Sequence, residues 1–183
     1  WSGSPSLGDP GWQRIFDFGQ DVLAEAGVGE YLYLTPMSGG DSQDQGLLFS
    51  TSLASYDSAQ GIASVLPVRQ ERWEHVAVVL SADEGRLYRD GDRVGAAPVT
   101  LDPFNVRMET NWLGRSRFGP LDYPLWGCLD EIAIWGRALS DAEIQSLYGR
   151  GAMRVSLQMR ACDGDPQSCE SLPFVGPDGT DLT

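Results

Sequence analysis

The sequence predicts an all-β protein, an antiparallel β-sandwich with one short helix, and three observations lead to this prediction. Short segments rich in β-forming residues recur through the first 135 residues at about ten-residue spacing, with turn formers between them. An Asp-Gly pair separates two of these segments, which is typical of a tight hairpin. Helical periodicity is clear only near residues 140–148. Strands so closely spaced favour a sandwich over a sheet of alternating strands and helices.

Each expected strand is a short run of alternating or β-branched and aromatic residues. These runs are residues 14–18, 31–35, 46–53, 73–80, 86–89, 93–95, 111–114 and 128–135. The run at 73–80 is the most strongly β-forming of them, and it contains the single histidine, His75. Asp90-Gly91 lies between the runs at 86–89 and 93–95. The two central residues of a type I′ turn need positive φ, so this pair predicts a hairpin.

The helix is predicted from its start signal and its apolar face. Ser140 followed by Glu143 forms a capping box, in which each side chain binds a free backbone N–H of the first turn. Ile144, Leu147 and Tyr148 fall on one face, which is enough to dock the helix on a sheet. Gly149 is the expected end of the helix.

Charge excludes two classes of partner. The chain has 26 acidic residues against 13 basic ones, all arginine, and a net charge of −13. Such a surface repels nucleic acid and anionic membranes. Residues 1–60 carry eight acids and one arginine, so this third is either a solvated face or a place to hold hard cations. No run of 18 apolar residues is present, so no membrane span is predicted.

The three cysteines suggest an oxidising location. Cys162 and Cys169 enclose six turn-forming residues, which predicts a local disulfide, with two free thiols as the alternative. A disulfide would place the protein outside the reducing cytosol. Cys128 stands between Gly127 and Leu129 and is expected to be a small buried apolar residue rather than a nucleophile.

Three blocks of sequence carry a family resemblance. They are residues 12–36, residues 73–91, and residues 113–140, the last containing the run Gly127-Cys128-Leu129-Asp130-Glu131-Ile132-Ala133-Ile134-Trp135. In this order and spacing they resemble the laminin-G-like jelly roll of the concanavalin A-like lectin/glucanase superfamily, over about residues 1–150. The resemblance is specific for the fold and weak for function, because that superfamily includes lectins, glucanases and adhesive repeats.

The resemblance implies an incomplete jelly roll over 1–151 and the start of a further β module over 152–183, as in large secreted bacterial proteins. In the family, the first strands come before the position that corresponds to Trp1, and the sequence offers no counterpart of them. Either the sequence is a piece of a longer chain, or another chain, including a second copy, supplies a strand by β-addition in a filament-like assembly. We therefore expect a secreted or cell-surface module whose partners are other protein chains or a glycan.

The resemblance also implies a structural calcium ion. Asp130 stands where laminarinase-type relatives present a carboxylate to Ca²⁺, and Asp17 on an early strand is the expected second ligand. Two carboxylates suffice when carbonyls and water complete the shell. The alternative is that Asp130 only caps a strand end.

Catalysis is not expected. Glycosidases of this superfamily use a Glu-x-Asp-x-x-Glu type motif, which the sequence lacks. Asp130 and Glu131 are adjacent, so on a strand they would point to opposite faces. His75 is interpreted as structural. The chain is therefore predicted to be a non-catalytic adhesion or structural module.

The alternative function is a calcium-dependent carbohydrate-binding module. Exposed aromatic rings stack on sugar faces, and the loop-rich region 111–126 supplies Trp112, Tyr123 and Trp126 beside Arg115. Trp73 and Trp135 fit core or sheet-packing positions better, and core packing is also the alternative for each ring of the patch.

Overall fold

The computed structural model describes residues 11–20, 29–39, 46–118 and 122–151. The chain divides into two units, Trp1–Tyr148 and Gly149–Thr183, and the described residues of the second unit are only the last three residues of the helix, 149–151. The predicted module at 152–183, with Cys162 and Cys169, lies outside the described residues. Its boundary near Gly151 stays a prediction, as does the disulfide.

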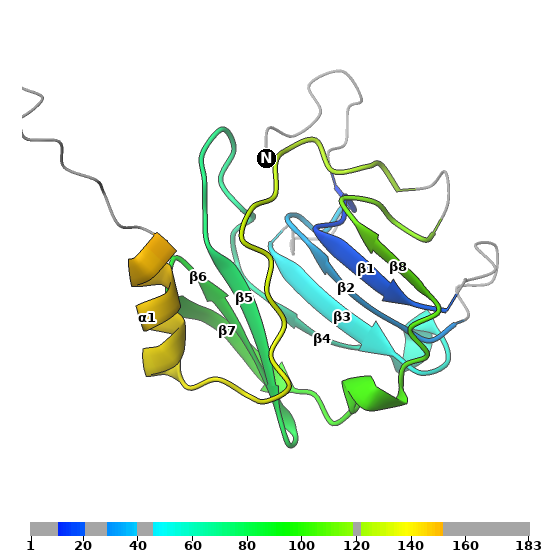
Figure 1. Ribbon diagram of the computed structural model, residues 1–183. Helices are drawn as coiled ribbons and strands as arrows, with labels where there is room; N and C mark the ends of the chain where they lie inside the picture. The colour runs from blue at the N-terminus through cyan, green and yellow to red at the C-terminus, as the bar shows by residue number, and fades with distance from the viewer. Residues whose placement is uncertain (1–10, 21–28, 40–45, 119–121, 152–183) are drawn as a thin grey trace, which may run out of the picture. The chain divides into compact units, whose positions relative to one another are not determined.

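The described strands form two antiparallel sheets (Figure 1). The larger sheet has the order β4-β3-β2-β1-β8, and the smaller has the order β5-β6-β7. The larger sheet comprises β1 (Phe16–Gly19), β2 (Tyr31–Thr35), β3 (Leu48–Ser52), β4 (Gln60–Ala63) and β8 (Thr110–Leu113). The smaller comprises β5 (Val76–Ser81), β6 (Glu84–Arg89) and β7 (Asp92–Pro98). Two 3₁₀ turns, η1 (Tyr56–Ser58) and η2 (Pro103–Asn105), follow β3 and β7. The predicted all-β sandwich is confirmed.

The main core lies between the two sheets. Alternate residues of β2 and β3, such as Leu32, Leu34 and Phe49, point inward and pack with Leu87 of β6. β4 lies against β6 and β7, where Ile62 closes over Gly85. A Cβ at Gly85 would lie 2.4 Å from the Ile62 Cδ1 atom and 2.8 Å from the Val99 Cγ2 atom, so a larger residue there would force these side chains to shift. Side chains alternate between the two faces of a strand, so every second residue of β2 and β3 faces this core.

The hairpin between β6 and β7 turns at Asp90 and Gly91, as predicted. Their φ angles are 51° and 83°, so both central residues adopt the left-handed conformation that this type of turn requires. The Asp90 side chain also accepts a hydrogen bond from the backbone N–H of His75, at 3.1 Å. The turn is thereby tied to the start of β5.

The helix α1 (Asp141–Gly151) is held as the sequence predicts at its start. The Glu143 N–H donates to Ser140 Oγ at 3.3 Å, and the Ser140 N–H donates to Glu143 Oε2 at 2.9 Å. Ile144 is buried with Leu139, Val79 and Tyr88 on the outer side of the smaller sheet. The predicted end at Gly149 is wrong, because the helix continues to Gly151. No helix among the described residues has the length and apolar character needed to cross a membrane.

The expected strand at 128–135 is not formed. This segment has irregular backbone, and all its side chains are exposed. The expectations that Cys128, Trp73 and Trp135 are buried are also wrong, because all three are exposed. A strand forms only when its backbone groups find a partner, and among the described residues this segment has none.

Candidate binding site on the outer face of the larger sheet

The face of the larger sheet that points away from the smaller sheet carries an unusual set of side chains. Asp17 of β1 is paired in register with Tyr33 of β2, so the two side chains share this outer face. Residues 114–126 run across it, described except for 119–121, and insert Phe118. The Phe118 ring packs edge-on against Tyr31 and Tyr33, with ring centroids 5.5 and 6.1 Å apart. The outer face is therefore a second, partly aromatic core.

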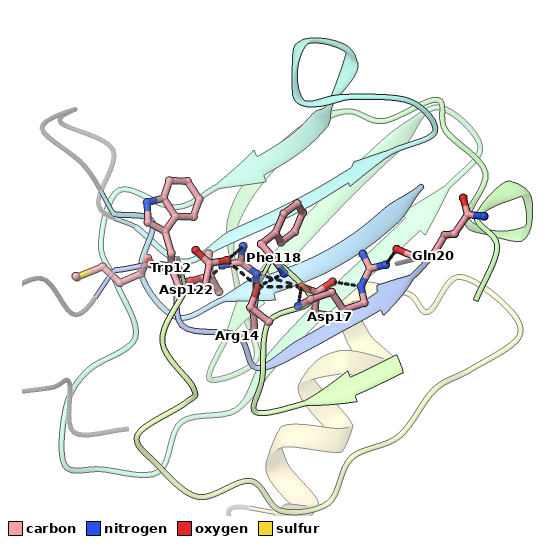
Figure 2. Close-up of polar contacts among 10 residues, drawn as sticks. Trp12, Arg14, Asp17, Gln20, Phe118 and Asp122 are labelled. Atoms are coloured by element: carbon pink, nitrogen blue, oxygen red, sulfur yellow. Dashed lines mark hydrogen bonds and ion pairs between the residues drawn. The ribbon is translucent and has the colours of Figure 1, made fainter. Parts of the chain in front are cut away.

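A buried network of charges joins the sheet to this loop (Figure 2). Arg117 Nε donates to Asp17 Oδ1 at 2.7 Å, and the Arg117 backbone N–H donates to Asp17 Oδ2 at 3.0 Å. Arg117 Nη1 also donates to the carbonyl oxygen of Gln20. The side chains of Asp17 and Arg117 are both fully buried. The ion pair thus fixes the loop to β1 by contacts that water does not reach.

Arg14 and Asp122 form the second pair of the network. Arg14 Nη2 donates to Asp122 Oδ2 at 2.7 Å, and Ser116 Oγ donates to the same oxygen at 2.7 Å. Arg14 Nε lies 3.6 Å from Asp17 Oδ2, which links the two pairs. The Arg14 guanidinium also stacks on the Tyr33 ring at 3.9 Å. Two arginines therefore compensate two aspartates in the same buried place.

Burial changes the titration of the groups around this network. Burial raises the pKa of Asp122, and the positive charge of Arg14 opposes that shift. Burial, with the neighbouring Tyr33 hydroxyl, raises the pKa of Tyr31 to about 12, and burial raises that of Tyr33 as well. Both tyrosine hydroxyls are therefore uncharged at neutral pH.

The anchored loop presents the aromatic side chains predicted as a glycan patch. The backbone N–H of Leu125 donates to the carbonyl oxygen of Gly114 at 2.8 Å, and that of Trp126 donates to Gln13 Oε1 at 2.7 Å. Tyr123 and Trp126 are exposed. Arg115 stacks on Trp112 of β8, with its guanidinium carbon 4.5 Å from the ring centroid. We call Trp112, Arg115, Tyr123 and Trp126 the aromatic surface.

The two expected calcium ligands have different surroundings. Among the described residues, the hydrogen bonds to the buried Asp17 carboxylate come from Ser116 and Arg117, and Arg14 and Arg117 compensate its charge. Asp130 is exposed, and its Oδ1 accepts the backbone N–H of Glu131 at 2.9 Å. In residues 11–20, 29–39, 46–118 and 122–151, no group of three or more metal-ligating side chains is assembled. Calcium binding stays a prediction.

Sequence reasoning missed the network of Arg14, Ser116, Arg117 and Asp122. Arg117 and Asp17 are a hundred residues apart, and no local spacing announces such a pair. The only local signal is that Arg14 stands three residues before Asp17. Residues three apart on a regular strand point to opposite faces, so this spacing does not predict an ion pair.

His75, interpreted as structural, is half-buried and packs on the Tyr148 ring of α1, with ring centroids 5.9 Å apart.

Comparison with known proteins identifies a family for most of the chain. The family model described as "Concanavalin A-like lectin/glucanases superfamily" matches residues 6–145. Among solved structures, the chain is similar to a 2.1 Å crystal structure of an S-layer domain-containing protein (residues 221–444) from Clostridium thermocellum ATCC 27405, with 28% identity and a TM-score of 0.40. That match covers 81% of this chain and 66% of the other, so this chain spans just under two thirds of it. No curated protein matches.

Proposed function

We propose, from the premise that this chain belongs to the concanavalin A-like lectin/glucanase superfamily, that it is a non-catalytic adhesion or structural module, secreted or displayed at a cell surface. It works through contacts with other protein chains, including strand addition. The observation that carries this proposal is that two of the four edge strands of the described sheets, β5 and β8, lie at the ends away from the contact between β4 and β7. β5 ends the smaller sheet and β8 ends the larger one, and each has only one neighbour there. Open edges are templates for pairing with another chain.

The non-catalytic role is supported by what the carboxylates do. Asp17 and Asp122 are engaged by buried arginines, and Asp130 stands beside Glu131 on an exposed segment. A retaining glycosidase needs two carboxyl groups about 5–5.5 Å apart across one sugar bond. The carboxylates of the outer face instead anchor a loop. A module of this kind positions a surface and does no bond-breaking chemistry.

A calcium-dependent carbohydrate-binding module is the second candidate function. The stacking of Arg115 on Trp112 favours it, because contact with the guanidinium restricts the orientation of the Trp112 ring. A ring of fixed orientation is preorganised to stack on the face of a sugar. Tyr123 and Trp126 extend the aromatic surface from the anchored loop. In this candidate Asp130 is the accessible carboxylate for the ion.

A glycan array, probed with the full chain with and without a chelator, separates the two candidates. Binding that disappears with the chelator and with Trp112→Ala supports the carbohydrate-binding module. An absence of glycan binding, together with masses above one chain in solution, supports the adhesion or structural module. Binding of glycan that survives the chelator would contradict the calcium dependence. Phe104→Ala is the matched control for Trp112→Ala, because Phe104 is also exposed but lies on η2.

A further inference from the structure

On one side of the sandwich, the inward-facing side chains of both sheets are only partly buried. One row of inward-facing residues runs across the larger sheet in register through Phe49, Leu34, Phe16 and Leu113. Phe49 and Leu34 are each 2% exposed, Phe16 is half-buried, and Leu113 is 51% exposed. The side chains of this row are therefore buried on β3 and β2 and partly exposed on β1 and β8.

The smaller sheet shows the same loss at β5. Leu87 of β6 is fully buried, whereas its register partner Val78 is only half-buried, as are Val76 and Leu80. These three β5 residues and Phe16 all pack against the main core. We call the edge of β5 with the inner face of β1 and β8 the open side. Among the described strands, β5 has a neighbour on one edge only, so its other edge offers backbone groups for pairing, and partly covered apolar side chains stand beside it.

The described chain also contains a segment that lacks a partner. Residues 129–135 are exposed, including Ile132 at 52% and Ile134 at 79%, and none of their backbone groups bonds to another backbone group among the described residues. Ile132 and Ile134 are two residues apart, so they share one face of an extended chain. Glu131 has a φ of 50°, a left-handed conformation that costs free energy for a residue with a side chain.

We propose that residues 129–135 of one copy add as a β-strand to the open side of a second copy. The two features are complementary, because the open side needs a strand with one apolar face, and Ile132 and Ile134 supply such a face. Exchange of an element between identical chains is a low-cost route to assembly. In the added strand Glu131 becomes extended. This inference rests on the proposed role in assembly and names the surface and the second copy that would carry it out.

The test compares the full wild-type chain with Ile134→Asp and with Leu66→Asp by light scattering and sedimentation over a range of concentrations. Leu66 is 59% exposed on the loop that follows β4, the edge strand opposite β8, so it is a matched control for an exposed apolar residue outside residues 129–135. We expect wild type and Leu66→Asp to reach at least twice the 19.9 kDa mass of one chain. Ile134→Asp should raise the dissociation constant by about 100-fold, since it buries a charge in the added strand.

Hydrogen exchange supplies a second readout that a merely unstable variant would not imitate. The β5 amides should gain protection as wild type associates, and Ile134→Asp should keep them unprotected while its thermal midpoint matches that of Leu66→Asp. Equal association of all three chains would refute the strand donor and leave assembly standing. A mass of 19.9 kDa at every concentration would refute the exchange, and the adhesion role would then be judged by the glycan array and by binding to other proteins.

Discussion

Asp17 determines the stability of the outer face, because it is the fully buried anion that Arg117 meets with both a side-chain and a backbone donor. Replacing it with alanine leaves Arg117 as a buried charge without its ion-pair partner. We expect Asp17→Ala to lower the free energy of unfolding by about 3–5 kcal/mol, measured by urea denaturation. Asp130→Ala is the control, since Asp130 is exposed, and should change it by less than about 0.5 kcal/mol.

The comparison of Asp17 and Asp130 also tests the calcium prediction. If Asp17 acts only as the ion-pair partner of arginine, it does not bind calcium. Asp17 should then cause no change in the unfolding midpoint of wild type when calcium is added. A rise in the midpoint with calcium that disappears in Asp130→Asn would instead assign the ion to the exposed carboxylate. Equal destabilisation by Asp17→Ala and Asp130→Ala would contradict the structural role given to the buried pair.

His75 should make stability depend on pH. Burial lowers its pKa from the ordinary value of 6.5, and the Asp90 carboxylate opposes that shift. Below about pH 6.5 the unfolded chain therefore binds a proton that the folded chain does not, so stability falls as the pH falls through this value. The thermal midpoint of wild type should drop between pH 7.5 and 5.5 by more than that of His75→Gln. Parallel curves for the two proteins would exclude His75 as the cause.

At the scale of elements, the start of α1 depends on the reciprocal contacts of Ser140 and Glu143. The guanidinium of Arg137 and the backbone N–H of Ser140 both donate to Glu143, and together they lower its pKa from 4.5 to about 2. Because the folded pKa is the lower one, this contribution is complete above about pH 4.5 and is lost as the pH falls towards 2.

We expect Ser140→Ala to lower the free energy of unfolding by about 1 kcal/mol at neutral pH, because a helix donor loses its cap. Far-ultraviolet circular dichroism with urea denaturation measures the change. Gln145→Ala, at an exposed position of the same helix, is the control and should be neutral or slightly stabilising. A loss in Gln145→Ala as large as that in Ser140→Ala would mean that general helix weakening, not capping, explains the result.

How far the sequence predicts an element depends on whether its signal is local. The strand at Tyr31–Thr35 and the start of the helix match the predictions, because alternation and a capping box are properties of neighbouring residues. β4 was not predicted: its four residues are Gln-Gly-Ile-Ala, and only Ile62 is buried. It is a strand because β3 offers it an edge.

The failed strand at 128–135 and the missed charge network share one physical reason. A β-forming run becomes a strand only through a partner elsewhere, and a buried ion pair needs two residues that the fold brings together. Asp17 is predicted as a calcium ligand because the resemblance places it on an early strand that could face Asp130, but its neighbours are Arg14 and Arg117. The sequence offers the members of the aromatic surface only as a candidate patch, with core packing as the alternative for each ring. The structure shows them exposed and places Arg115 on Trp112.

At the scale of the whole molecule, the net charge of −13 acts against every contact between two copies. Like charges repel across the gap between approaching chains, and salt screens that repulsion over a Debye length of about 10 Å at 0.1 M and about 3 Å at 1 M. Strand exchange, by contrast, depends on backbone hydrogen bonds and on apolar contact through Ile132 and Ile134, which salt does not weaken.

We therefore expect wild-type self-association to strengthen by about tenfold between 0.1 M and 1 M sodium chloride, measured by sedimentation equilibrium. Leu66→Asp is the control, because it adds one negative charge outside residues 129–135 and should show the same salt dependence. Ile134→Asp should remain dissociated at both concentrations, since screening does not restore the apolar face. Association that weakens with salt would show that ion pairs join the copies, and it would move the interface away from residues 129–135.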